Sequence, residues 1–250
     1  MELVGALDLG DRELVSFVGA GGKKTSMAQL VEEGRSRHRV GYTTTTHMPP
    51  PDWLPVVVAG PDTIGDRIAA ASAPLAFASR RVENPARVDT KVKGFDPSAL
   101  DRLFAAELLD WIVVKADGAR MREFKAPGEG EPAIPQASTV VVPVVSAKIF
   151  GQPLDENVVH RPERVAAIAN VELGIEITPS LVGRVLADPA GGLKDVPDGA
   201  RVVGMINKAD DERERAQATE ALRTAFDRAD RFGSGLVSSF EADVLERLQP

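Results

Sequence analysis

Short apolar runs alternate along the chain with segments in which apolar residues recur at helical spacing. The apolar runs predict buried strands at residues 14–18, 40–47, 56–59, 75–78, 111–115, 140–145, 202–206 and 235–237. The helical spacing predicts helices at residues 3–9, 63–72, 97–109, 162–169, 179–186, 211–228 and 240–248, and one more that begins near residue 23. Strands that alternate with helices imply an α/β fold, with a mostly parallel sheet covered by helices on both faces.

Three segments interrupt this alternation. Residues 79–93 alternate between polar and apolar strongly enough to predict a β-hairpin insertion. Residues 124–135 are rich in proline and charge, which predicts a long loop. A small helical insertion is expected at about 152–200. We therefore expect a single α/β domain over residues 1–250 that carries this insertion.

The loop between the first strand and its helix is rich in glycine and lysine. Glycines let backbone N–H groups point inward, the helix N-terminus adds partial positive charge, and a lysine neutralises phosphates. We interpret the segment as a phosphate-binding loop, which makes the fold P-loop NTPase-like. The alternative is a strand-to-helix turn that binds nothing. The candidate nucleotide-binding residues of this loop are Gly19, Gly21, Gly22, Lys23, Lys24, Thr25 and Ser26.

The P-loop pattern G-x-x-x-x-G-K-[ST] fits this loop in two registers, and neither fit is complete. With Lys23 as the phosphate lysine, Gly22 fits the second glycine position. Phe17 then occupies the first glycine position, and Lys24 occupies the hydroxyl position. With Lys24 as the phosphate lysine, Thr25 supplies a hydroxyl for Mg²⁺, but neither glycine position holds a glycine. The dinucleotide pattern G-x-G-x-x-G would need glycine at position 24, so a dinucleotide site is disfavoured.

The strand at residues 40–47 ends in threonines and a histidine. Ligands of open parallel sheets bind at the carboxyl ends of the strands, where these side chains are expected. Thr45, Thr46 and His47 are therefore candidates for contact with a γ-phosphate or a second substrate. The alternative is a threonine-rich edge strand with a solvated histidine.

The strand at residues 111–115 is followed by Asp117 and a glycine. An apolar strand that ends in this way resembles a Walker B motif, in which a carboxylate lies beside the phosphate-bound metal. Asp117 and Thr25 are thus the candidate Mg²⁺ ligands. The alternative is that Asp-Gly forms only a turn.

The strand at residues 202–206 leads into an N-K-x-D pattern made by Asn207, Lys208 and Asp210. GTPases use this pattern to recognise guanine: the aspartate accepts hydrogen bonds from the base, the lysine stem covers the ring and the asparagine braces the loop. The alternative is that Asn207 and Asp210 cap a turn and a helix. Residues 146–148 read Ser-Ala-Lys, like another guanine-contacting loop of GTPases, but they precede the N-K-x-D pattern, so we do not assign them to the base.

Composition narrows the class of partner. A formal net charge of −7 argues against broad nucleic-acid binding, which calls for a basic face. No apolar run approaches the roughly 20 residues of a membrane span, and the start of the chain lacks the pattern of a signal peptide. With no cysteine, the chain can form neither a disulfide nor a thiolate zinc site. We expect a cytoplasmic protein whose partner is a nucleotide, and neither nucleic acid nor a membrane.

Together these segments resemble the YqeC-type selenium-dependent hydroxylase accessory proteins. The matching blocks, in order along the chain, are residues 18–23, 43–47, 116–120, 125–127, 131–132, 134–135, 159–163 and 207–210. The resemblance implies a P-loop protein that binds a nucleoside triphosphate and is associated with the maturation of molybdenum-containing hydroxylases. Two positions depart from the family pattern: Lys24 replaces the first hydroxyl of G-G-K-T-T, and Lys115 replaces an acidic residue before Ala-Asp-Gly.

The leading hypothesis is an accessory protein that binds GTP or ATP with Mg²⁺ and hydrolyses it, as a P-loop NTPase, during maturation of a molybdenum hydroxylase. Lys23 would hold the outer phosphates, Thr25 or Ser26 the metal, and Asp117 the metal or its water. Lys23, Asp117 and His47 are the candidate catalytic residues.

Two other functions stay open at this point. One is a small-molecule kinase or nucleotidyltransferase in which His47, Arg120 and Lys125 bind a pterin-type acceptor, and catalysis consists of positioning and charge neutralisation. The other is a non-catalytic chaperone that is switched by a nucleotide and docks on a hydroxylase.

Overall fold

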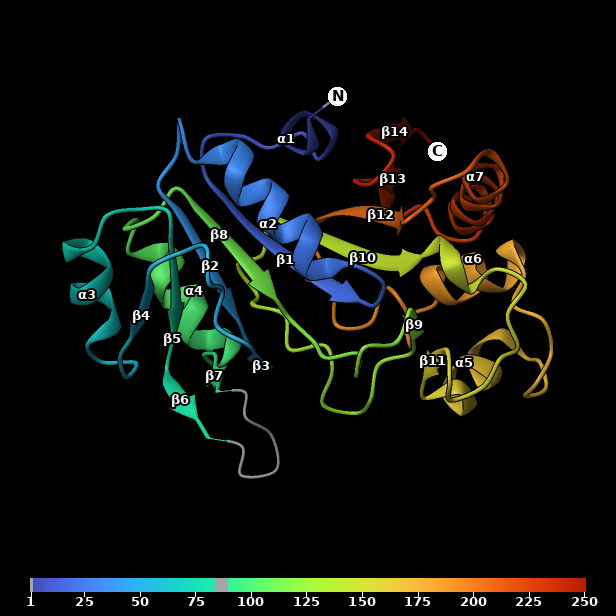
Figure 1. The fold of residues 1–250 in the computed structure, drawn as a ribbon, viewed down its shortest axis with the longest axis horizontal. Helices are drawn as coiled ribbons and strands as arrows, with labels where there is room; N and C mark the ends of the chain where they lie inside the picture. The colour runs from blue at the N-terminus through green and yellow to red at the C-terminus, as the bar shows by residue number, and fades with distance from the viewer. Residues whose placement is uncertain (1, 84–89) are drawn as a thin grey trace.

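The computed structural model describes residues 2–83 and 90–250. Its centre is a nine-stranded sheet (Figure 1) in which neighbouring strands run parallel, except for the antiparallel pair β13 and β14. In spatial order its strands are β14 (Val244–Leu248), β13 (Phe232–Ser239), β12 (Arg201–Asn207), β10 (Val140–Ser146), β1 (Glu13–Gly19), β8 (Trp111–Lys115), β2 (Val40–Thr44), β5 (Leu75–Ala78) and β4 (Val56–Val58). The predicted α/β fold with a mostly parallel sheet is confirmed.

Helices cover both faces of this sheet, because its central strands are apolar on both sides. In β1, Val15 and Phe17 pack into one hydrophobic cluster with α1 and α2, whereas Leu14 and Val18 pack on the opposite face with α3 and α4. A third cluster joins α5, α6 and α7 to β10 and β12. The helices are α1 (Leu3–Ala6), α2 (Lys23–Gly34), α3 (Ile64–Ala70), α4 (Pro97–Ala105), α5 (Pro162–Ala169), α6 (Pro179–Ala187) and α7 (Glu212–Phe226), with a 3₁₀ turn, η1 (Ala147–Ile149).

The order of the strands places the glycine loop at a topological switch point. From β1 the chain adds β2, β4 and β5 on one side and returns with β8, which lies between β1 and β2. It then continues on the other side of β1 with β10, β12 and β13. Ligands of open α/β sheets bind outside the carboxyl ends of the strands at such a point. The loop that follows β1 lies there.

The predicted strand at residues 40–47 is divided between two sheets. Thr46 N donates to Thr44 Oγ1 (3.0 Å), a local bond that competes with strand pairing and turns the chain. After the turn, β3 (His47–Met48) pairs with β7 (Lys91–Lys93), which also pairs with β6 (Arg80–Val82). The antiparallel pair of β6 and β7 confirms the predicted hairpin; residues 84–89 lie outside the described residues.

The helices of the predicted insertion begin where the sequence indicates: α5 spans the predicted range, and α6 ends one residue later than predicted. The predicted loop at 124–135 contains one short strand, β9 (Phe124–Lys125), which pairs with β11 (Val159–His160). In the described part of the chain, no helix is both long enough and apolar enough to cross a membrane.

The prediction of a final helix at residues 240–248 is wrong, because this segment contains the edge strand β14. Spacing alone gave Leu245 and Leu248 one helical face. In the structure Leu245 packs against the cluster on one face of the sheet and Leu248 against the cluster on the other. Residues three apart point to opposite sides of a strand, so β14 buries both while it pairs with β13.

Candidate functional site

The loop after β1 has a conformation that only glycine adopts readily. Gly19, Gly21 and Gly22 have φ angles of 87°, 83° and 114°. A Cβ on Gly21 would lie 2.3 Å from the backbone nitrogen of Ser146. A Cβ on Gly22 would lie 2.1 Å from Asn207 Nδ2. The loop is therefore pressed against the carboxyl ends of β10 and β12, and larger residues would displace it.

Four consecutive backbone N–H groups of this loop have no acceptor among the residues that the structure describes. No oxygen of the described residues pairs with the N–H groups of Gly21, Gly22, Lys23 and Lys24. Because α2 begins at Lys23, the positive end of its dipole lies at the same place. Unpaired N–H groups at a helix N-terminus that follows a glycine loop form a suitable site for phosphate.

The two lysines after the glycines have different surroundings. Lys23 is buried, and its ammonium group donates to the carbonyl of Gly19 and lies 2.8 Å from Asp117 Oδ1. Burial lowers the pKa of Lys23, and the attraction of Asp117 opposes this shift. Lys24 and Thr25 are exposed. Lys23 is thus the lysine that lies within the loop.

Asp117 is buried at the centre of the site. Its Oδ2 accepts a hydrogen bond from the N–H of Gly19 (2.9 Å) and lies 2.9 Å from the ammonium group of Lys125. Burial would raise the pKa of Asp117, but Lys23, Lys125 and the N–H of Gly19 together hold it below its usual value of 3.8. Asp117 is therefore a carboxylate at neutral pH.

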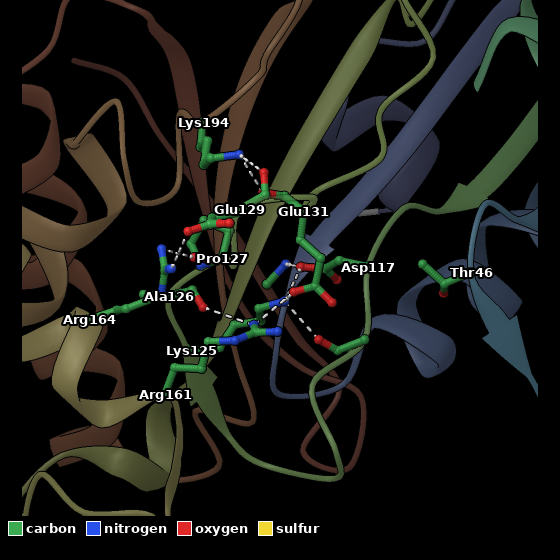
Figure 2. A network of polar contacts seen from close by, with 12 residues as sticks. Thr46, Asp117, Lys125, Ala126, Pro127, Glu129, Glu131, Arg161, Arg164 and Lys194 are labelled. Atoms are coloured by element: carbon green, nitrogen blue, oxygen red, sulfur yellow. Dashed lines mark hydrogen bonds and ion pairs between the residues drawn. The ribbon is translucent and has the colours of Figure 1, made fainter. Parts of the chain in front are cut away.

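A chain of ion pairs extends from Asp117 into the loop at 124–135, as Figure 2 shows. Lys125 lies 2.7 Å from Glu131 and donates to the carbonyl of Gly118 (2.7 Å). Glu131 in turn lies 2.8 Å from Arg161. The side chain of Lys125 is only 1% exposed, so it holds this loop against Asp117. The sequence suggests Lys125 as a contact for an acceptor and indicates no role for Glu131 or Arg161, since ion pairs between distant loops leave no local pattern.

Two of the candidate residues after β2, Thr46 and His47, accept hydrogen bonds from Lys115, the last residue of β8. The ammonium group of Lys115 donates to Thr46 Oγ1 (2.9 Å) and to the carbonyl of His47 (3.2 Å). Thr44 Oγ1 accepts or donates a further bond with Thr46 Oγ1 (3.0 Å). Thr45 Oγ1 is buried and has no hydrogen-bond partner among the described residues. Burial lowers the pKa of Lys115 to about 8, and nearby Lys23 contributes to this shift.

His47 itself is exposed and lies among cations. Its pKa is lowered by burial and then by Lys93, Lys91, Arg80 and Lys115, which all disfavour the imidazolium form. His47 is thus neutral at pH 7. Among the described residues, no hydrogen bond or ion pair joins the His47 side chain to Lys23 or Asp117; its carbonyl accepts from Lys115.

The asparagine of the N-K-x-D pattern braces the glycine loop. Asn207 Nδ2 donates to the carbonyl of Gly21 (3.2 Å), and Asn207 Oδ1 accepts from Ser238 Oγ (3.0 Å). Lys208 lies close to the same loop, and its ammonium group pairs with Glu123 (2.7 Å). The bracing contact is the one that the pattern predicts for the asparagine.

Asp210 is half-buried and occupied on both oxygens. Ser239 Oγ donates to Oδ1 (2.6 Å), and Lys148 lies 2.8 Å from Oδ2. The hydrogen bonds from Lys148 and Ser239 lower the pKa of Asp210. Lys148 belongs to the Ser-Ala-Lys segment, which precedes the N-K-x-D pattern in the sequence and was not assigned to the base for that reason. The fold nevertheless places this segment beside the N-K-x-D residues. Lys148 also pairs with Glu214 of α7 (2.7 Å).

The donors near the loop fit a magnesium ion that is held mainly by a nucleotide. No cluster of three His, Asp or Glu side chains suited to a metal occurs in the described part of the chain. Mg²⁺ usually keeps several waters and binds through one or two carboxylates plus substrate phosphates. Asp117 Oδ1 is buried and lies 2.8 Å from the ammonium group of Lys23, so a metal-bound water would reach it only where a ligand draws Lys23 away. Thr25 is exposed in the first turn of α2, and buried Ser26 bonds to the carbonyl of Gly22 (3.4 Å).

A glycine loop after β1 and an aspartate after the adjacent strand β8 define a P-loop NTPase-like α/β protein. The chain belongs to the YqeC family, because the family model "YqeC protein" matches residues 15–163. It is also 34% identical over 208 residues to "Uncharacterized protein YqeC" of Escherichia coli (strain K12), a match that covers 81% of this chain and 79% of that relative. The N-K-x-D residues lie beyond the family-model match, so their interpretation depends on their own geometry.

Proposed function

We propose that this chain is a cytoplasmic protein that binds a nucleoside triphosphate with Mg²⁺, hydrolyses it, and serves the maturation of a molybdenum-containing hydroxylase. The observation that carries the nucleotide proposal is the set of four unpaired N–H groups at residues 21–24, beside buried Lys23 and Asp117. Lys23 and Asp117 lie 2.8 Å apart and neutralise each other. A bound triphosphate would take Lys23 from Asp117 and free the carboxylate for the metal.

Mg²⁺, when bound, supplies charge neutralisation for the phosphates. Lys23 would hold the outer phosphate oxygens, and the loop N–H groups would hold the others. Asp117 would orient a metal-bound water, and Thr25 or Ser26 would supply a hydroxyl from the first turn of α2. Thr46, tied to Lys115, would lie toward the γ-phosphate side of the site.

Guanine is the base that the N-K-x-D residues favour. Asp210 can accept two hydrogen bonds from N1 and the exocyclic amine of guanine, whereas adenine presents an acceptor at N1. Lys148 and Ser239 already hold the Asp210 carboxylate in place. Guanine would displace Lys148 from Asp210, and Glu214 would retain the released ammonium group.

The proposed role in hydroxylase maturation does not depend on the geometry of the site. It is supported by the resemblance of the chain to the YqeC-type accessory proteins. A client protein or its cofactor would be the second partner. A kinase or nucleotidyltransferase is the second candidate function, and it is favoured by Thr46 and His47, which reach Lys115 beside the phosphate site. A hydrolase needs only water there, whereas a transferase needs an acceptor.

Titration of GTP, ATP and CTP into one metal-containing preparation tests the nucleotide proposal. The loss of a hydrogen bond to a charged group costs roughly 1.5–3 kcal/mol, so GTP should bind at least about tenfold more tightly than ATP. Equal affinities would remove the guanine assignment and leave the phosphate loop. No binding of any triphosphate, with or without Mg²⁺, would contradict the proposed function.

A further inference from the structure

Basic side chains line one face of the small sheet formed by β3, β7 and β6. His47 is the direct partner of Lys93, and Lys93 is the direct partner of Arg80. Direct partners in antiparallel strands project from the same face. Lys91, two residues before Lys93, shares that face, whereas Val92 and Met48 are buried on the opposite one. We call His47, Arg80, Lys91 and Lys93 the basic face.

Within the described part of the chain, the cations of the basic face form no ion pairs with carboxylates, unlike several other lysines. Among residues 2–83 and 90–250, no carboxylate forms an ion pair with Arg80, Lys91 or Lys93, nor with the neighbouring Lys115. Carboxylate partners are present for Lys23, Lys125, Lys148, Lys194 and Lys208. Like charges directly opposite each other destabilise a sheet. In a chain of net charge −7, this local excess of positive charge is not a consequence of composition.

The basic face borders the phosphate loop. Lys115 donates to Thr46 Oγ1 and to the carbonyl of His47, the first residue of the face. Lys115 is also in register with Phe17 of β1, two residues before the first glycine of the loop. Figure 1 shows β3, β6 and β7 beyond the carboxyl ends of β2 and β5, on the loop side of the main sheet.

We propose that the basic face, with Lys115 and Thr46, is a subsite for a second small molecule that carries a phosphate group. Arg80 offers a planar fork for two phosphate oxygens, and the lysines offer point charges. Strands of two or three residues make a face only about 10 Å long, at about 3.3 Å per residue. That size suits one or two phosphate groups and is too small for a nucleic acid or an extended acidic peptide.

Binding at this subsite is independent of the proposed function, but its role as an acceptor site beside a triphosphate rests on that function. The residues of this subsite differ from the acceptor contacts expected from the sequence, which included Lys125. Lys125 is buried and pairs with Asp117 and Glu131, so it is not free to contact an acceptor. In the proposed subsite Lys93 and Arg80 supply the positive charge instead. Both lie on the hairpin that follows β5, with no chemical motif of their own in the sequence.

Calorimetric titration of inorganic pyrophosphate into the full-length protein tests the subsite. The Lys23→Ala background removes the phosphate loop as a competing site. In that background Arg80→Gln and Lys93→Gln should each weaken pyrophosphate binding by roughly tenfold, the effect of losing a charge-assisted hydrogen bond. Arg81→Gln is the matched control: it removes the same charge from the same strand, but Arg81 pairs with Val92 and faces the other way. It should leave the affinity unchanged.

If all three substitutions weaken pyrophosphate binding equally, the effect is one of net charge and the subsite is overturned. The subsite is also overturned if neither Arg80→Gln nor Lys93→Gln weakens binding. Tighter binding of a polyglutamate peptide than of pyrophosphate, with the same sensitivity, would overturn the small-molecule assignment. If Lys23→Ala leaves pyrophosphate binding unchanged while Arg80→Gln weakens it, the subsite stands and the phosphate-loop proposal fails. If Lys23→Ala abolishes all pyrophosphate binding, the phosphate loop stands and the subsite fails.

Discussion

Gly21→Ala should destabilise the protein and disrupt the glycine loop after β1. Gly21 has a φ of 83°, and a Cβ there would lie 2.3 Å from the backbone nitrogen and 2.6 Å from the Cβ of Ser146. Ser146 cannot retreat easily, because its N–H donates to the carbonyl of Glu123 (3.1 Å) and β10 is held between β1 and β12. The loop must therefore move instead.

The cost of this substitution has two parts. A side chain in the left-handed region costs about 1–2 kcal/mol, and overpacking against backbone adds about 1–3 kcal/mol. The free energy of unfolding should therefore fall by about 2–5 kcal/mol. Since the loop whose N–H groups we propose to hold phosphate would move, binding of Mg·GTP should weaken as well.

Urea denaturation and nucleotide titration of the same variant measure both effects. Gly118→Ala is the matched control, since Gly118 also borders the site but nothing lies within 4 Å of a Cβ built on it. That control should change the free energy of unfolding by less than about 1 kcal/mol. If Gly21→Ala matches the wild type in both stability and nucleotide affinity, the geometry inferred for the loop is wrong.

Three further predictions concern individual carboxylates of the site. Asp117→Asn should abolish magnesium-dependent turnover but leave metal-free nucleotide binding largely intact; unchanged turnover would leave Asp117 only its structural ion pairs with Lys23 and Lys125. Asp210→Asn should shift the preference from GTP toward xanthosine triphosphate, measured by competition; an unaltered preference would separate Asp210 from base recognition. Burial would raise the pKa of Glu131, but Lys125 and Arg161 hold it below its usual value of 4.5. The stability that these pairs give is present above that value and is lost as the pH falls through the lowered pKa, so Glu131→Gln should make acid unfolding less steep, and an identical acid profile would contradict it.

The main sheet could be predicted because its strands are buried on both faces. A continuous apolar run such as residues 140–145 has few alternatives to a central parallel strand. The helices α5 and α6 could be predicted equally well, since each begins with a proline in its first turn. The strand in the final segment could not be predicted in this way, because the spacing of Leu245 and Leu248 is compatible with both a helix and an edge strand. The segment forms a strand because it pairs with the outer edge of β13.

The candidate site likewise contains features that could be predicted from the sequence and features that could not. The glycine loop and Asp117 come at the ends of β1 and β8, and Asn207 is the last residue of β12, so their position at one edge of the sheet is implied by the order of the elements. The pairs of Lys125 with Asp117 and of Lys148 with Asp210 depend on where long loops cross that edge. Lys115 ends an apolar strand as a charged residue, and that is the one local signal of its contact with Thr46.

The most direct test of nucleotide binding at this loop is a calorimetric comparison of Mg·GTP affinity among the wild type, Lys23→Ala and Lys24→Ala. Lys23 is buried within the loop and Lys24 is exposed, although the two are adjacent and carry the same charge. We predict that Lys23→Ala loses about 1.5–3 kcal/mol of binding free energy, the value of a charge-assisted hydrogen bond, and that Lys24→Ala loses distinctly less. Equal losses in the two variants, or a larger loss in Lys24→Ala, would contradict the assignment of Lys23 as the phosphate lysine.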